Sequence, residues 1–126
     1  MNVVDSSAWL EYFAAGPNAG WFADAIERTR ELLVPSICLY EVFKRVVQQR
    51  SENDALQAVA IMEQGRVVDV DAATALSAAR ISLDQRLSMA DSLILAITRH
   101  NKAVLWTQDG HFQGLENVRV RAAAGG

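Results

Sequence analysis

Four acidic residues lie where the sequence pattern favours a chemical site. Asp5 directly follows the apolar run "NVV", and Asp109 comes shortly after the run "AVLWT". Glu41 falls in the second turn of a predicted helix after Pro35, and Asp91 falls in the first turn of the helical pattern "SMADSLILAI". Carboxylates that converge raise each other's pKa unless a cation or a shared proton relieves the repulsion. If these four residues meet, we expect a metal site or an acid–base site.

Each of these carboxylates also has an ordinary structural explanation. Asp5 precedes a helix whose N-terminal N–H groups favour an anion, and Asp91 completes a Ser-x-x-Asp capping box. Asp109 begins an Asp-Gly turn signal, and Glu41 has the helical spacing of a surface ion pair with Arg45. Four separate explanations are therefore needed to dismiss a site, whereas convergence alone explains all four positions.

The elements that must position these residues alternate between strand and helix. Short apolar strands are expected at residues 2–4, 31–35, 66–70, 103–107 and 117–120, with helical patterns between them. Strands separated by helices require crossover connections, which predict a three-layer α/β/α domain with a mainly parallel sheet of about five short strands. Ligands bind beyond the carboxyl ends of such strands, which is where Asp5 and Asp109 are expected.

Capping residues mark where the predicted helices begin. We expect Ser6 or Ser7 to cap the first helix and Ser36 to cap the helix that carries Glu41. Asp71 is expected to cap a helix over residues 72–86, and Ser88 is expected to cap the next helix, which contains Asp91.

Length and composition are those of a globular protein with a single core. The 126 residues are 51% hydrophobic and 21% charged, which predicts one domain over residues 1–126 with a frayed tail from about residue 122. Cys38 is the only cysteine, which excludes an internal disulfide and favours a reducing cytoplasm. The sequence contains no apolar run of about 18 residues, so we expect no membrane span.

An all-oxygen set of ligands selects a hard divalent cation. Mg²⁺ or Mn²⁺ is therefore expected rather than zinc, which prefers nitrogen and sulfur. Thr107 and Ser6 are candidates to hydrogen-bond the carboxylates or a water molecule beside them. Peripheral or structural roles are predicted for His100 and His111.

The sequence resembles the PIN-domain ribonucleases, and most closely the VapC-like toxins of toxin–antitoxin modules. The resemblance spans nearly the whole chain and is carried by "VVDSSAWL", "PSICLYEVFKRV", "ADSLILA" and "LWTQDGHF", in the order that the family shows. The family's acidic positions correspond to Asp5, Glu41, Asp91 and Asp109. Its supporting hydroxyl positions correspond to Thr107 and Ser6, where Ser6 replaces a common threonine but keeps the hydroxyl.

This resemblance implies an endoribonuclease that depends on Mg²⁺ or Mn²⁺, forms a homodimer and is bound by a small antitoxin that occupies its cleft. Asp5, Asp91 and Asp109 would hold the metal, and Glu41 would orient or deprotonate a water molecule or bind a second ion. The net charge of −3 gives no general support for RNA binding, but it becomes +1 once these four carboxylates are neutralised. Lys44 and Arg45 are the basic residues predicted to line a phosphate-binding groove.

Two other classes of function fit the same pattern. One is a catalytically silent PIN-like module that acts only in dimerisation or regulation. The other is a Mg²⁺-dependent phosphohydrolase or phosphoacceptor domain, which also gathers aspartates at strand ends. Against phosphoacceptor chemistry, Asp5 is followed by serines rather than by a second acidic residue.

Overall fold

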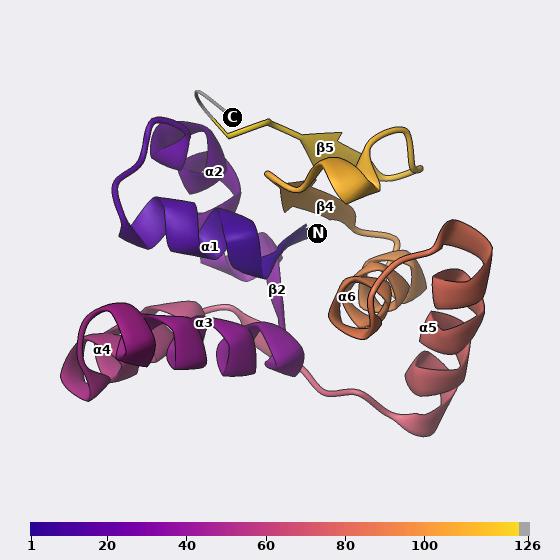
Figure 1. The fold of residues 1–126 in the computed structure, drawn as a ribbon, viewed down its shortest axis with the longest axis horizontal. Coiled ribbons are helices and arrows are strands. Elements are labelled where there is room, and N and C mark those ends of the chain that lie inside the picture. Colours follow the sequence, from indigo (N-terminus) through magenta and orange to yellow (C-terminus); the bar gives the residue numbers. More distant parts are fainter. Residues whose placement is uncertain (124–126) are drawn as a thin grey trace.

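A computed structural model describes residues 1–123, and their strands form one parallel sheet (Figure 1). The strands are β1 (Asn2–Val4), β2 (Leu32–Pro35), β3 (Arg66–Val68), β4 (Val104–Thr107) and β5 (Val118–Val120). Their order across the sheet is β3-β2-β1-β4-β5. The central strand is β1, in which Val3 pairs with Leu33 on one side and with Leu105 on the other. The predicted five-stranded parallel sheet is confirmed.

Helices cover both faces of this sheet. They are α1 (Ser6–Phe13), α2 (Ala19–Ile26), α3 (Ser36–Gln49), α4 (Glu52–Met62), α5 (Ala72–Gln85) and α6 (Met89–His100), with short 3₁₀ helices η1 (Thr29–Glu31) and η2 (Gly110–Phe112). In Figure 1, α1 to α4 lie to the left of the sheet and α5 and α6 lie to its right. The chain steps outward from β1 to β3 on one side and then crosses to β4 on the other. Right-handed crossovers therefore place the two sets of helices on opposite faces, as predicted for three layers.

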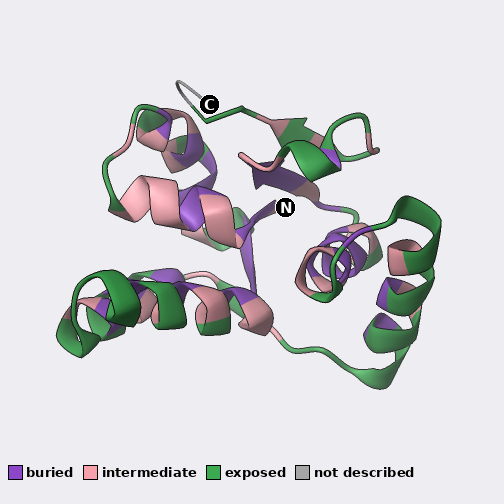
Figure 2. Ribbon diagram, viewed as in Figure 1, coloured by how far each residue is buried: buried purple, intermediate pink, exposed green. Residues whose placement is uncertain are grey.

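The core lies between the sheet and its two helical layers. Val3, Val4, Leu33 and Leu105 are completely buried, as expected for strands that are covered on both faces. Figure 2 shows buried residues concentrated in β1, β2, β4 and the inner part of the molecule around α6. Helix α6 is buried over most of its circumference, because it packs against β4 on one side and α5 on the other. The core therefore fixes the start of α6, where Asp91 lies.

Two helices begin differently from the sequence prediction. The N-cap of α1 is Asp5 rather than Ser6 or Ser7, because β1 ends at Val4 and the extended backbone of Asp5 directs its side chain to the N–H of Ala8. The residue before α3 is Pro35, with no side-chain cap, so Ser36 is the first helical residue and not its cap. The predicted caps of α5 and α6, Asp71 and Ser88, are present.

The end of the described chain is held against the domain by Arg121, whose N–H donates a hydrogen bond of 2.9 Å to the carbonyl oxygen of Thr107, and by Ala122. The side-chain amide of Asn18 donates a hydrogen bond of 2.9 Å to the carbonyl oxygen of Ala122. The predicted frayed tail from about residue 122 falls mostly on residues 124–126, which lie outside the described residues. In the described part of the chain, no helix combines the length and apolar character needed to cross a membrane.

Candidate active site

The carboxyl edge of the sheet brings the four predicted acidic residues around one cavity of about 300 Å³. Asp5 follows the central strand β1, and Asp109 follows the adjacent strand β4. Glu41 is presented by α3 and Asp91 by the first turn of α6. Because α6 leads back into the parallel strand β4, its N-terminus lies at the edge where the strands end. All four carboxylates line this cavity, as their positions in the sequence suggested.

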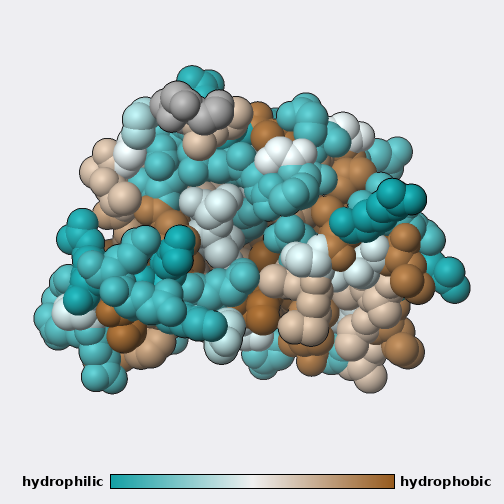
Figure 3. Space-filling view, viewed as in Figure 1, coloured by the Kyte–Doolittle hydropathy of each residue, from teal (hydrophilic) through white to brown (hydrophobic). Residues whose placement is uncertain are grey.

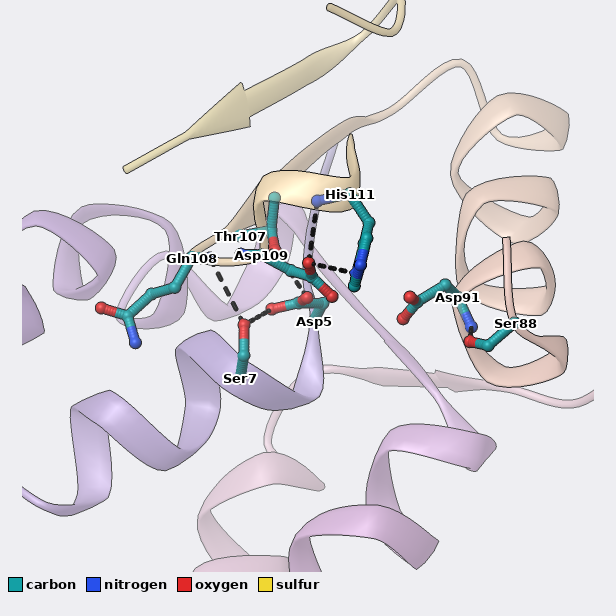
Figure 4. Close-up of polar contacts among 8 residues, drawn as sticks. All are labelled: Asp5, Ser7, Ser88, Asp91, Thr107, Gln108, Asp109 and His111. Carbon is teal, nitrogen blue, oxygen red and sulfur yellow. Dashed lines mark hydrogen bonds and ion pairs between the residues drawn. The ribbon is translucent and has the colours of Figure 1, made fainter. Parts of the chain in front are cut away.

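Asp5 forms the deepest part of the site and is only 3% exposed. Its Oδ1 accepts a hydrogen bond of 2.8 Å from the Ser7 hydroxyl, and its Oδ2 accepts one of 2.6 Å from the Thr107 hydroxyl (Figure 4). Oδ1 also accepts the Ala8 N–H at 3.0 Å. These bonds favour the ionised carboxylate, but burial outweighs them and raises the pKa of Asp5 to about 6. An ionised Asp5 is therefore costly unless a cation lies nearby.

Thr107 connects the two strand ends. While its hydroxyl donates to Asp5, its oxygen accepts the backbone N–H of Asp109 at 2.9 Å. Thr107 is completely buried as the last residue of β4, so its hydroxyl is held rigidly between the two acidic residues. The predicted supporting position of Thr107 thus corresponds to direct contacts with both of them.

Asp91 and Asp109 form the outer part of the site together with His111. Burial raises the pKa of Asp91, and the negative charge of Asp109 raises it further. Ligand atoms of Asp91, Asp109 and His111 all lie within 4.8 Å of one another, and Figure 4 shows the three side chains facing the same space. Asp5 and Glu41 border the same cavity but do not belong to this closest group.

Glu41 is held by a different hydroxyl from the one that holds Asp5. The Ser6 side chain donates a hydrogen bond of 2.6 Å to Glu41 Oε1. Ser6 therefore orients Glu41, whereas the next residue, Ser7, supports Asp5. The alternative explanation of Glu41, an ion pair with Arg45, is not observed: among residues 1–123, the ion pair found within 4.0 Å joins His111 and Asp109.

The site contains two features that the sequence prediction did not assign. Ser7 bonds Asp5 and accepts the backbone N–H of Gln108 at 3.3 Å, so it ties α1 to the end of β4. His111 lies within the acidic cluster although its side chain is 79% exposed, so the peripheral role expected for it describes its exposure but not its neighbours. Of the two basic residues that the sequence favoured for phosphate contact, Arg45 lines the cavity, one helical turn from Glu41, and Lys44 is not among the described lining residues.

The residues present fit a divalent cation. Three aspartates supply the oxygen ligands that Mg²⁺ and Mn²⁺ prefer. The raised pKa values of Asp5 and Asp91 arise from burial and from neighbouring negative charge, both of which a bound cation would offset. The type of donor atom and the electrostatics of the site therefore both favour a bound divalent cation.

The fold and this site define a class of protein: a three-layer α/β domain with an acidic cavity at the carboxyl edge of a parallel sheet. Within that class, the chain belongs to the PIN-domain family, whose sequence profile matches residues 3–117. A search among curated proteins gives no match.

Solved structures with the same fold include toxins of toxin–antitoxin modules. The chain is similar to a toxin–antitoxin complex from Klebsiella pneumoniae, with a TM-score of 0.80 and 16% identity over 95% of this chain and 97% of that one. It is also similar to VapC20 of Mycobacterium tuberculosis, described as a sarcin-ricin loop cleaving toxin, with a TM-score of 0.79 and 20% identity over 96% and 99%. A third is VapBC2 of Rickettsia felis bound to promoter DNA, with a TM-score of 0.73 and 16% identity over 96% and 97%. The predicted VapC-like fold is confirmed.

Proposed function

We propose that this protein is a metal-dependent endoribonuclease and the toxin of a VapBC-type toxin–antitoxin module. The observation that supports this proposal most directly is the convergence of Asp5, Glu41, Asp91 and Asp109 on one cavity of a PIN fold. The description of VapC20 as a sarcin-ricin loop cleaving toxin supports RNA as the substrate. Action on RNA would place the protein in the cytoplasm.

Different residues of the site would hold the cation and activate the attacking water. Asp5, Asp91 and Asp109 would hold Mg²⁺, with Mn²⁺ as a substitute, and Thr107 would keep Asp5 and Asp109 in register. When bound, the cation supplies acidification of water and charge neutralisation at the phosphate. Glu41, fixed by the Ser6 hydroxyl, would orient the attacking water and take its proton.

Arg45 is placed to contact the substrate's phosphate groups. It borders the acidic cavity and is exposed, and its guanidinium forms no ion pair with the described acidic residues. Lys44 lies next to it on the exposed surface of α3, beside the ring of Tyr40. These two cations would bind the RNA backbone beside the acidic cavity.

Two kinds of protein partner belong to this proposal: a second copy of the chain and a small antitoxin. The structural neighbours include toxin–antitoxin complexes, which supports an antitoxin partner. Exposed apolar side chains offer contact surfaces for such partners. Figure 3 shows one at its lower right, over α5 and the start of α6, where Leu76, Leu83 and Met89 are exposed. Trp21 and Phe22 are less available, because Phe22 is fully buried and Trp21 packs on Trp106.

A circular RNA tests the proposed activity and its rivals together. Because a circle has no ends, its conversion to linear fragments by the purified chain requires internal cleavage. We expect cutting in Mg²⁺ or Mn²⁺ and none in EDTA, with a matched circular DNA left intact. Release of phosphate from p-nitrophenyl phosphate without RNA cutting would instead indicate a phosphohydrolase. An uncut circle under every metal condition would favour a catalytically silent module.

Replacing Arg45 should weaken RNA binding without removing the metal site. We expect Arg45→Gln to raise the Kd for RNA about fivefold and to lower the slope of log K against log salt by about 0.7, as for one lost phosphate contact on a single strand. The measurement is fluorescence anisotropy over a salt series, with Asp91→Asn present in all samples to prevent cutting. Arg80→Gln, an exposed change on α5 away from the cavity, is the matched control. Equal affinities for the Arg45 and Arg80 variants would contradict the assigned contact.

A further inference from the structure

The imidazole of His111 lies at the rim of the acidic cavity, between two carboxylates. Its ligand nitrogen is within 4.8 Å of an oxygen of Asp91 and an oxygen of Asp109. In Figure 4 the ring of His111 stands between the carboxylate of Asp109 and that of Asp91. The cluster is therefore not purely acidic, because it offers one nitrogen donor beside its oxygens.

One hydrogen bond and one close contact join His111 to a single oxygen of Asp109. Asp109 Oδ1 accepts the backbone N–H of His111 at 2.9 Å and lies 2.8 Å from the ring Nδ1. Oδ2 of Asp109 receives no hydrogen bond from the part of the chain that the structure describes, so it is available to a cation. When Nδ1 donates to Oδ1, the neutral ring carries its free lone pair on Nε2. A neutral imidazole with a free nitrogen lone pair is a common metal ligand.

We infer that His111 is a metal ligand, acting with Asp91 and Asp109, and that it makes this part of the site prefer a first-row transition ion to Mg²⁺. This inference rests on the proposed metal-dependent function and adds a selectivity to it. Mg²⁺ binds oxygen ligands and retains several waters, so a nitrogen donor contributes little to its affinity. Imidazole suits transition ions, and Mn²⁺ accepts carboxylates and imidazole together. The role of His111 is therefore to raise the affinity for Mn²⁺ selectively.

Mn²⁺ binding gives a direct test that does not depend on activity. With one equivalent of Mn²⁺ bound to the full chain, electron spin-echo spectra should show ¹⁴N modulation from a coordinated imidazole. We expect this modulation in the wild type and in His100→Ala, and its loss in His111→Ala. His100 is the matched control, because it is the chain's only other histidine and its Nε2 contacts Ser77 at the far end of α6.

Calorimetry then measures the selectivity. His111→Ala should weaken Mn²⁺ binding by about tenfold or more while changing Mg²⁺ affinity by less than about twofold. His100→Ala should leave both affinities unchanged. Because the side chain of His111 is exposed, His111→Ala should leave the fold intact. If the variant fails to fold, the ¹⁴N modulation of the wild type still tests whether an imidazole binds the ion.

The possible outcomes separate this inference from the proposed function. Mn²⁺ binding without ¹⁴N modulation in the wild type, or equal losses of Mn²⁺ and Mg²⁺ affinity in His111→Ala, would overturn the role of His111 and leave the carboxylate site standing. Failure of the wild type to bind either ion would overturn the metal site itself and this inference with it.

Discussion

Asp5→Asn and Asp91→Asn should each lower the rate of RNA cleavage by about 10³-fold or more, since both changes remove charge that offsets the developing transition-state charge through a cation. Asparagine keeps the size of the side chain and one oxygen, so the variants test the carboxylate charge rather than the packing. Asp5 is the more firmly positioned of the two side chains, because three hydrogen bonds hold its carboxylate in place. The measurement is the initial rate of cutting of a labelled RNA under saturating Mg²⁺.

A surface aspartate provides the control for these variants. Asp24 is exposed on α2 and does not line the acidic cavity, so Asp24→Asn should cut at the wild-type rate. Circular dichroism melts establish that each variant is folded under the assay conditions. Wild-type rates in folded Asp5→Asn and Asp91→Asn would remove these residues from the catalytic machinery.

The fold was predictable because its three central strands, β1, β2 and β4, are buried on both faces. A strand covered by helices on either side has to be apolar at consecutive positions, and "NVV", "LLV" and "VLW" satisfy that requirement directly. The order of the strands was not predictable from pattern, since the position of β1 between β2 and β4 depends on packing among segments distant in sequence. The carboxyl edge of the sheet could nevertheless be assigned, because all parallel strands end at the same edge.

The candidate site was predictable to the level of residues but not of contacts. Asp5 and Asp109 are identified by their place after strands, and Glu41 and Asp91 by their place in early helical turns. Which serine supports which carboxylate depends on where α1 begins. Because Asp5 is itself the cap, the neighbouring hydroxyls of Ser6 and Ser7 diverge, one to Glu41 and one to Asp5.

The structural and chemical explanations of these carboxylates proved compatible. Asp5 caps α1 and Asp109 caps η2, yet both also line the acidic cavity. A carboxylate needs only one oxygen to cap a helix, and its second oxygen remains available for another contact. Capping therefore does not compete with a site at the carboxyl edge of the sheet; it orients the side chains that form the site.

Burial of Asp5 should make the metal-free protein less stable as the pH rises. The pKa of this residue is about 6 in the folded chain and 3.8 in the unfolded reference, so between these values the folded state holds a proton that the unfolded state has lost. The unfolded state then binds fewer protons, and the free energy of unfolding falls as pH increases through this window. The loss amounts to at most about 3 kcal/mol, at 1.36 kcal/mol per pKa unit. Chemical denaturation in EDTA between pH 3.5 and 7.5 measures it.

The difference between wild type and Asp5→Asn isolates this effect from every other titrating group. Asparagine cannot ionise, so the variant should equal or exceed the wild type in stability at pH 7.5 without metal and lose that advantage near pH 4. A bound cation offsets the same buried charge, so Mg²⁺ at a hundredfold excess over its Kd should stabilise the wild type at pH 7.5 by about 2.7 kcal/mol. It should stabilise Asp5→Asn far less. If the two proteins kept the same difference in stability at every pH, and Mg²⁺ stabilised them equally, Asp5 would not be a buried charge that a bound cation stabilises. The free-energy cost of burying the ionised Asp5 and the affinity of the site for metal are thus two measurements of one electrostatic interaction.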